Sequence, residues 1–141
     1  MLIDQTVVGR TGEARVVEVE KGAIRKFAEA IGDSHPLYHD ESFAKSSGYQ
    51  SIVAPPTFPT TFRVPLPDVQ FELSRVLHGE QEYEYTRPIV AGDTLRCSNR
   101  VVDVYERQGS LGSMTFLVTE MTGEDLDGNP VFTGRSTIIL R

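Results

Sequence analysis

The fold of this 141-residue chain is decided by a stretch at residues 79–89, which reads G-E-Q-E-Y-E-Y-T-R-P-I. In this stretch Gln81, Tyr83 and Tyr85 alternate with three glutamates. A period of two residues is typical of a β-strand that turns one face to a core or a partner and the other face to solvent. The stretch therefore predicts a strand.

The residues that follow this stretch also favour β-strands. The segment G-E-D-L-D-G-N-P at 123–130 has the composition of a hairpin turn, and the segments on either side of it are rich in β-favouring residues. Further strands are expected at Thr94–Glu106, Leu111–Met121 and Val131–Leu140. The second half of the chain is therefore predicted to form an antiparallel sheet.

The first half has a different period. Ala14–Glu20 alternates and predicts a strand, but from Lys21 the apolar residues recur at i, i+3, i+4 and i+7, which predicts an amphipathic helix that Gly32 ends. A short helix is expected from Asp40 to Gly48, and another after the paired prolines at 55–56, with Pro59 in its first turn. Helices followed by strands indicate an α+β fold whose helices cover one face of the sheet.

The composition is that of one globular domain spanning residues 1–141. A formal charge of −6 with scattered Lys and Arg argues against a nucleic-acid partner. The single cysteine, Cys97, lies in a predicted strand and is expected to be buried rather than nucleophilic. The start of the chain lacks a signal-peptide pattern, and no apolar run approaches the roughly 18 residues of a membrane helix. We therefore expect a cytoplasmic protein without a membrane partner.

Residues 32–40 read G-D-S-H-P-L-Y-H-D and place two carboxylates and two histidines where the first predicted helix ends. Ionisable groups beside apolar surface are candidates for general acid–base chemistry, because burial and neighbouring charge shift their pKa values. The same residue types also cap backbone groups in polar turns. A metal site formed by His35, His39 and Asp40 is not expected, since nothing in the pattern fixes a ligand geometry.

Four segments in order resemble the MaoC-like hydratases and dehydratases, and most closely the branch called MaoC-like dehydratase N-terminal domains. They are residues 32–40, A-P-P-T-F at 54–58, L-H-G-E-Q at 77–81 and R-P-I-V-A-G-D-T-L at 87–95. The resemblance covers essentially the whole chain. It implies the hot-dog fold, in which an antiparallel sheet wraps a long central helix, and a dimer made by joining two sheets.

The activity that the resemblance implies is that of an (R)-specific enoyl-thioester hydratase or 3-hydroxyacyl-thioester dehydratase. Water would add reversibly to an enoyl thioester of coenzyme A or of acyl carrier protein, with no cofactor. Such a reaction needs a group that activates water, a group that handles the proton at the α carbon, and a donor for the thioester oxygen. In active members, the resemblance implies, an Asp and a His five residues later hold the water. A backbone N–H at the start of the central helix binds the oxygen.

The match to the catalytic pair is mixed. Asp33 matches the family's catalytic Asp, but Tyr38 stands five residues later where the family has His. A phenol with a pKa near 10 donates a proton readily but is a poor base at neutral pH. His35 stands where the family has Asn, and His39 is displaced by one residue. Spacing alone leaves open whether either histidine replaces the missing one.

The match to the oxygen-binding site is mixed as well. Pro56 stands where active members have a glycine, and proline carries no N–H. The amide of Thr57 or Phe58 is expected to serve instead, because the first turn of a helix offers several free donors. His78 is a further candidate substrate contact, although satisfying loop carbonyls is the more ordinary role for such a histidine.

Two functions follow from these matches and mismatches. In the first the chain is an enzyme, with Asp33 as general base. In the second it is a non-catalytic subunit that binds the acyl chain and pairs with a MaoC-like partner carrying the intact Asp and His. Asp33 favours the enzyme, whereas Tyr38 and Pro56 favour the binding subunit. A homodimer or a heterodimer with another MaoC-like subunit is expected in both cases.

A hot-dog thioesterase is a weaker third candidate. Such enzymes normally place a carboxylate on or near the central helix. Asp68 and Glu72 are the carboxylates in that part of the sequence, and neither can be placed in the fold from the pattern alone.

Overall fold

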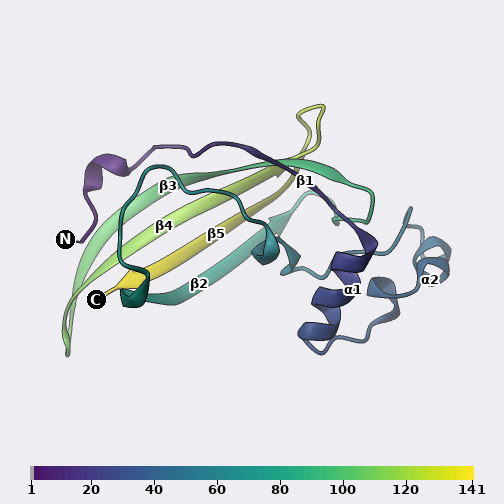
Figure 1. Ribbon diagram of the computed structural model, residues 1–141, viewed down its shortest axis with the longest axis horizontal. Helices are drawn as coiled ribbons and strands as arrows, with labels where there is room; N and C mark the ends of the chain where they lie inside the picture. Colours follow the sequence, from purple (N-terminus) through teal and green to yellow (C-terminus); the bar gives the residue numbers. More distant parts are fainter. Residues whose placement is uncertain (1) are drawn as a thin grey trace.

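The computed structural model describes residues 2–141, which form one antiparallel sheet of five strands in the order β1-β3-β4-β5-β2 (Figure 1). The strands are β1 (Arg15–Glu18), β2 (Val76–Tyr85), β3 (Thr94–Gly109), β4 (Gly112–Glu124) and β5 (Pro130–Leu140). The predicted strands are confirmed. The strand predicted from residue 79 begins earlier, at Val76, and it ends at Tyr85, before the Arg87-Pro88 pair.

Two α-helices precede the long strands. They are α1 (Lys21–Ala30), which buries Ile24 and Ala28, and α2 (Glu41–Ser46). Asp40 caps α2, because its Oδ1 accepts the N–H of Phe43 at 3.1 Å. Both helices are therefore formed where the sequence predicts them. Short 3-10 helices occur at η1 (Gln5–Val7), η2 (Pro36–Tyr38), η3 (Phe58–Thr61) and η4 (Leu73–Arg75).

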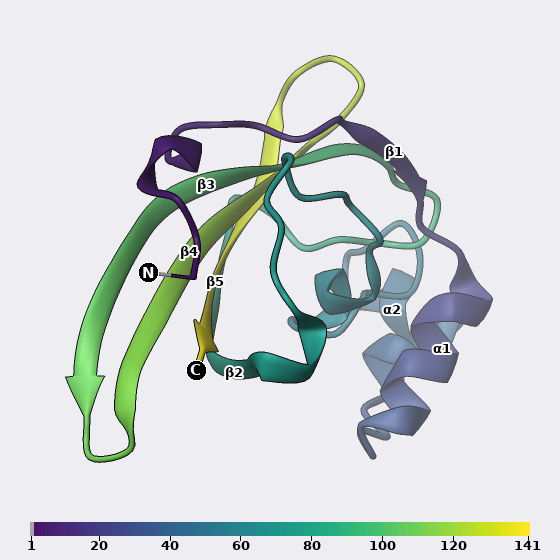
Figure 2. The ribbon, with the colours of Figure 1, turned by 60° about the vertical axis from the view of Figure 1, so that its left-hand side comes forward.

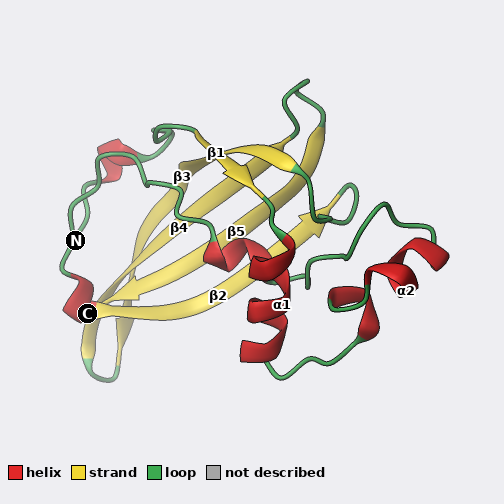
Figure 3. Ribbon diagram, turned by 45° about the vertical axis from the view of Figure 1, so that its right-hand side comes forward, coloured by secondary structure: helices red, strands yellow, loops and turns green. Residues whose placement is uncertain are grey.

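The helices and the long connection before β2 lie on one side of the curved sheet (Figure 2), and α2 lies beyond one end of it (Figure 3). Two buried clusters fill the interior. One joins the helical region to the near end of the sheet and includes Ile24, Ile52 and Leu95, and the other joins the N-terminal segment to the far end through Val101 and Leu117. Within residues 2–141, no helix has the length and apolar character needed to span a membrane.

The long central helix expected after Pro56 does not form, and this part of the prediction is wrong. The chain makes the four-residue η3 and then runs without helix or strand through residues 62–72, which we call the strap. Prolines explain the difference, because Pro65 and Pro67 disfavour helical backbone at the residues before them and lack the N–H that a helix interior requires. An extended strap therefore lies where a helix was expected.

The strap is held at two neighbouring positions. Asn99 of β3, only 7% exposed, donates its side-chain N–H to the carbonyl oxygen of Val64 at 3.0 Å. Next to Asn99, the N-terminal segment meets the strap at Gly12, where an added Cβ would lie 2.5 Å from the carbonyl oxygen of Pro65. Only glycine permits so close an approach of two backbones. The N–H of Gly12 donates to the carbonyl oxygen of Asn99 at 2.8 Å. The strap is therefore held against β3 and the N-terminal segment that pairs with β3.

Aromatic rings occupy the end of the sheet nearest the helices. The ring of Phe62 lies edge-on to Phe58 and to Phe132, at centroid distances of 5.5 and 6.1 Å. Phe132 in turn contacts Tyr83 and Tyr85 at 6.4 and 6.0 Å. Such edge-on and tilted contacts add to the stabilisation that ring burial provides. The aromatic cluster joins the start of the strap to β2 and β5.

Candidate functional site

The loop after α1 is a compact hydrogen-bonded turn. Asp33 accepts the N–H of His35 on its Oδ1 at 3.0 Å, and the Nδ1 of His35 accepts the N–H of Leu37 at 3.1 Å. The Nε2 of His39 lies 3.0 Å from the carbonyl oxygen of Asp33, a hydrogen bond that requires the proton on Nε2. The polar groups of this loop thus cap its backbone, which is one of the two roles that the sequence predicts.

Neither histidine of this loop lines either of the two cavities described below. The ring of His35 is exposed and lies between the rings of Tyr38 and Phe43, at 5.7 and 6.2 Å. His39 is half-buried and is held by its bond to the Asp33 backbone. The structure therefore gives no support to either histidine as a substitute for the missing catalytic one.

Tyr38, by contrast, lines a cleft of about 310 Å³, which we call the Tyr38 cleft. Its other lining residues are Leu37, Val53, Ala54, Pro56 and Tyr85–Ile89. Burial raises the pKa of the Tyr38 phenol above its usual value, and the nearby negative charge of Asp33 raises it further. At neutral pH Tyr38 is therefore a proton donor and not a base.

The start of η3 offers few donors for an oxyanion. The N–H of Phe58 already donates to the carbonyl oxygen of Pro55 at 2.9 Å, and the Phe58 side chain is buried in the core at 3% exposure. The carbonyl oxygen of Pro56 accepts the hydroxyl of Tyr85. The exposed Thr57 carries the one amide of this segment that makes no hydrogen bond with residues 2–141. Thr57 is thus the remaining candidate donor at this position.

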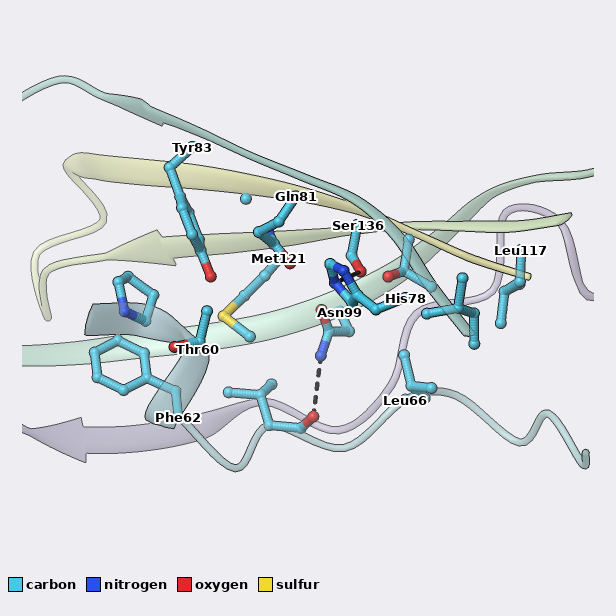
Figure 4. Close-up of a pocket in the computed structure, with 15 residues that line it drawn as sticks. Thr60, Phe62, Leu66, His78, Gln81, Tyr83, Asn99, Leu117, Met121 and Ser136 are labelled. Carbon is cyan, nitrogen blue, oxygen red and sulfur yellow. Dashed lines mark hydrogen bonds between the residues drawn. The ribbon is translucent and has the colours of Figure 1, made fainter. Parts of the chain in front are cut away.

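A larger cavity of about 400 Å³ lies between the sheet and the strap (Figure 4). We call it the sheet groove. Phe62, Val64 and Leu66 of the strap form one wall, and Leu117 and Met121 of β4 lie on the sheet side. The other lining residues are Pro59, Thr60, His78, Gln81, Tyr83, Asn99, Thr119, Gly134, Ser136 and Ile138. The groove is mostly apolar, with a few polar side chains spaced along it.

His78 belongs to the sheet groove because of a bulge in β2. The register between β2 and β5 shifts between His78 and Glu80, so that Gly79 has no partner of its own. The bulge changes the alternation and turns His78 to the same face as Gln81 and Tyr83. Its Nε2 lies 3.5 Å from the hydroxyl of Ser136. The predicted substrate contact His78 is thus separated from Tyr38 and Pro56, which line the other cavity.

Sequence reasoning did not identify most of the groove. The sequence predicts a helix through Phe62 and Val64 and gives no assignment from Leu66 onward, and Asn99, Met121 and Ser136 have the pattern of ordinary strand residues. One signal was available, because five prolines between residues 55 and 67 are incompatible with a long helix.

Comparison with known proteins identifies the family. A family model described as FAS1-like, dehydratase domain region, matches residues 6–134. The chain belongs to this family. It is also 38% identical to the UPF0336 protein of Saccharopolyspora erythraea, across the whole of this chain and 93% of that protein.

Solved structures agree with the family assignment. The fold matches a chain of the HadBC (3R-hydroxyacyl-ACP dehydratase) complex from Mycobacterium tuberculosis with a TM-score of 0.79 at 24% identity, covering 99% of both chains. It matches a MaoC-like dehydratase with the same TM-score of 0.79 at 27% identity, covering 95% of this chain and 42% of that one. The hot-dog sheet and the resemblance to MaoC-like dehydratases are therefore confirmed.

Proposed function

We propose that this chain is the acyl-chain-binding subunit of a heterodimeric MaoC-like dehydratase, and that its partner supplies the catalytic Asp and His. The observation that carries the proposal is the sheet groove. Where a central helix was expected, the extended strap borders a mostly apolar cavity of about 400 Å³, within the size range of small-molecule sites. Each methylene of an acyl chain buried in such a groove contributes about 0.8 kcal/mol.

The chemistry of the Tyr38 cleft supports the same proposal. The cleft contains a protonated phenol but no histidine, and the proline at its edge has no N–H to offer a thioester oxygen. The two histidines of the neighbouring loop are committed to backbone hydrogen bonds. A hydratase needs both a base and an oxyanion donor, and this cleft is poor in both.

The comparisons add the expectation of a partner. The HadBC structure carries the name of a 3R-hydroxyacyl-ACP dehydratase complex. By extension, we expect this chain to act on a 3-hydroxyacyl or enoyl thioester only as part of a complex. Whether the acyl group is carried by coenzyme A or by a carrier protein is a second question for the same assay.

One observation favours the alternative, an enzyme active by itself. Asp33 is half-buried and close enough to Tyr38 to raise the pKa of that phenol. A carboxylate base beside a protonated phenol is a possible acid–base pair. The alternative therefore requires the charge of Asp33, and removing that charge tests it.

The deciding experiment uses Asp33→Asn, because asparagine keeps an acceptor for the His35 N–H and removes only the charge. Turnover is followed by the absorbance of the enoyl-CoA double bond, for the chain alone and for its complex with a MaoC-like protein that has both motif residues. We expect no turnover by the chain alone, and turnover by the complex that survives Asp33→Asn but not loss of the partner's Asp. Turnover by the chain alone that Asp33→Asn abolishes would establish the enzyme instead.

A further inference from the structure

The sheet has one long uncovered edge. β2 pairs only with β5, so the backbone groups on its other side are free along Val76–Tyr85 in the described chain. The opposite edge is different, because the N-terminal segment covers β3 beyond β1. Gly9 and Arg10 exchange hydrogen bonds with Val101, at 2.8 and 2.9 Å. An exposed strand of this length is a template for pairing with another chain.

A row of alternating charge crosses the convex face of the sheet and ends at this edge. Arg100 of β3 is directly opposite Glu120 of β4, and Glu120 is directly opposite Arg135 of β5. The charged groups lie 3.8 and 3.1 Å apart. Arg135 is in turn opposite Glu82 of β2. The row therefore alternates between positive and negative charge, and Glu82, its last residue, lies at the free edge.

Glu82 has a glutamate on either side of it along the same face of β2. Glu80 and Glu84 are exposed like Glu82, and they lie opposite the uncharged residues Thr137 and Thr133. Gln81 and Tyr83 point to the other face, into the sheet groove. The convex side of the free edge is therefore a line of three carboxylates.

Two copies of this chain cannot pair antiparallel about the middle of β2, at residues 81–83, without opposing these carboxylates. In antiparallel pairing, residues directly opposite each other share a face, so a sheet that continues smoothly must pair even-numbered residues with even-numbered ones. If the pairing is centred on Glu82, the two copies of Glu82 lie opposite each other, and Glu80 of each copy lies opposite Glu84 of the other. Pairing centred on Gln81 sets Glu80 against Glu82. Like charges directly opposite are destabilising.

We infer that the β2 edge pairs with a different hot-dog subunit, one whose edge strand carries Lys or Arg on its convex face. The three glutamates of β2, at residues 80, 82 and 84, disfavour pairing with a second copy of this chain. A cation opposite Glu82 would continue the alternating row across the joined sheet. This inference rests on the proposed function only in that both call for a heterodimer. It names the surface and the charge of the partner.

The test uses the chain itself as the probe. In the variant E80K/E82K/E84K, the three negative charges on the convex side of β2 become positive. Sedimentation velocity is measured for the wild type alone, the variant alone and an equal mixture, and hydrogen exchange of the β2 amides locates any contact. We expect the mixture to associate roughly tenfold or more tightly than either protein alone, with protection of the β2 amides in the mixture. The matched control, E13K/E18K/E29K, changes the net charge equally at exposed positions away from β2.

Other outcomes would overturn the inference. A stable wild-type homodimer that protects β2 would do so, as would equal association of the control variant with the wild type, because net charge would then be the cause. A mixture that stays monomeric would overturn it as well, provided that E80Q/E82Q/E84Q, which removes the repulsion without new charges, also stays monomeric. These measurements use no substrate, so they are independent of the turnover assay.

Discussion

The side-chain amide of Asn99 donates a hydrogen bond to the carbonyl oxygen of Val64 in the sheet groove, at 3.0 Å (Figure 4). Through it β3, the second strand of the sheet, holds the strap against the sheet. The bond is nearly buried, since Asn99 is 7% exposed. The width of the groove therefore depends on this bond and on the crossing of Gly12 over Pro65.

Asn99→Ala should destabilise the protein by about 1–3 kcal/mol, because the carbonyl of Val64 loses its partner in a buried place. Urea denaturation measures the loss. The strap should also become more accessible, so that trypsin cleaves faster after Arg63. Asn129→Ala is the control, because it removes an exposed side-chain bond to Asp125 and should cost no more than about 0.5 kcal/mol. Equal effects of the two substitutions would argue against a role of Asn99 in holding the strap.

Gly134→Ala should also be destabilising, by about 1–3 kcal/mol, because a Cβ there would lie 2.6 Å from Cε1 of the Tyr83 ring. Adding Tyr83→Leu should recover part of the loss. Gly22→Ala in α1 is the control of opposite sign, since nothing lies within 4 Å of a Cβ at that position. It should stabilise the protein by about 0.5–1 kcal/mol. Thermal unfolding of the three variants would contradict this account if Gly134→Ala were neutral.

The free energy of unfolding should fall at alkaline pH. Burial raises the pKa of Tyr83 from 10.0 to about 12 and that of the Cys97 thiol from 9.0 to about 12. Between these values the unfolded chain releases protons that the folded chain retains, so the unfolded state is favoured as pH rises. The stability is therefore complete below about pH 9 and declines toward pH 12.

Tyr83→Phe tests the cause of this decline. No hydrogen bond holds the Tyr83 hydroxyl within residues 2–141, so the substitution should change stability little at pH 7. The fall above pH 10 should become shallower. Urea unfolding between pH 7 and 11 provides the comparison, and an unchanged slope would assign the decline to other groups.

Met121→Trp should reduce the binding of long acyl chains, because Met121 lines the sheet groove and a larger ring would fill it. We expect binding of a twelve-carbon acyl thioester to weaken at least about tenfold, while a four-carbon one is little affected. Met114→Trp is the control, with the same substitution on β4 outside the groove lining. Titration calorimetry measures both, and equal weakening by the control would place the acyl chain elsewhere.

Much of the fold could be predicted because local patterns are sufficient for it. Period two marked the long strands, period 3.6 marked α1, and Asp40 marked the start of α2. The missed element was the strap. Apolar residues at 58, 62 and 64 indicate a helix, but Pro65 and Pro67 disfavour helical backbone there.

The candidate site was predicted less well than the fold. The sequence identified Asp33 and Tyr38, and the structure brings Tyr38 to a cleft together with Pro56. It could not reveal that His35 and His39 are held by backbone hydrogen bonds, since spacing in a loop does not determine where a side chain points. Nor could it reveal the bulge at Gly79 that turns His78 into the groove.

The sequence by itself determined the antiparallel sheet, the two short helices, the family resemblance and the absence of a histidine five residues after Asp33, because these depend on residue type and spacing along the chain. Tertiary structure decided the rest. The groove exists because Asn99 and Gly12, far apart in sequence but hydrogen-bonded to each other, both contact the strap. The charge row exists because pairing aligns Arg100, Glu120, Arg135 and Glu82 across four strands. Long-range register and backbone approach are set by packing of the whole chain, and no local pattern encodes them.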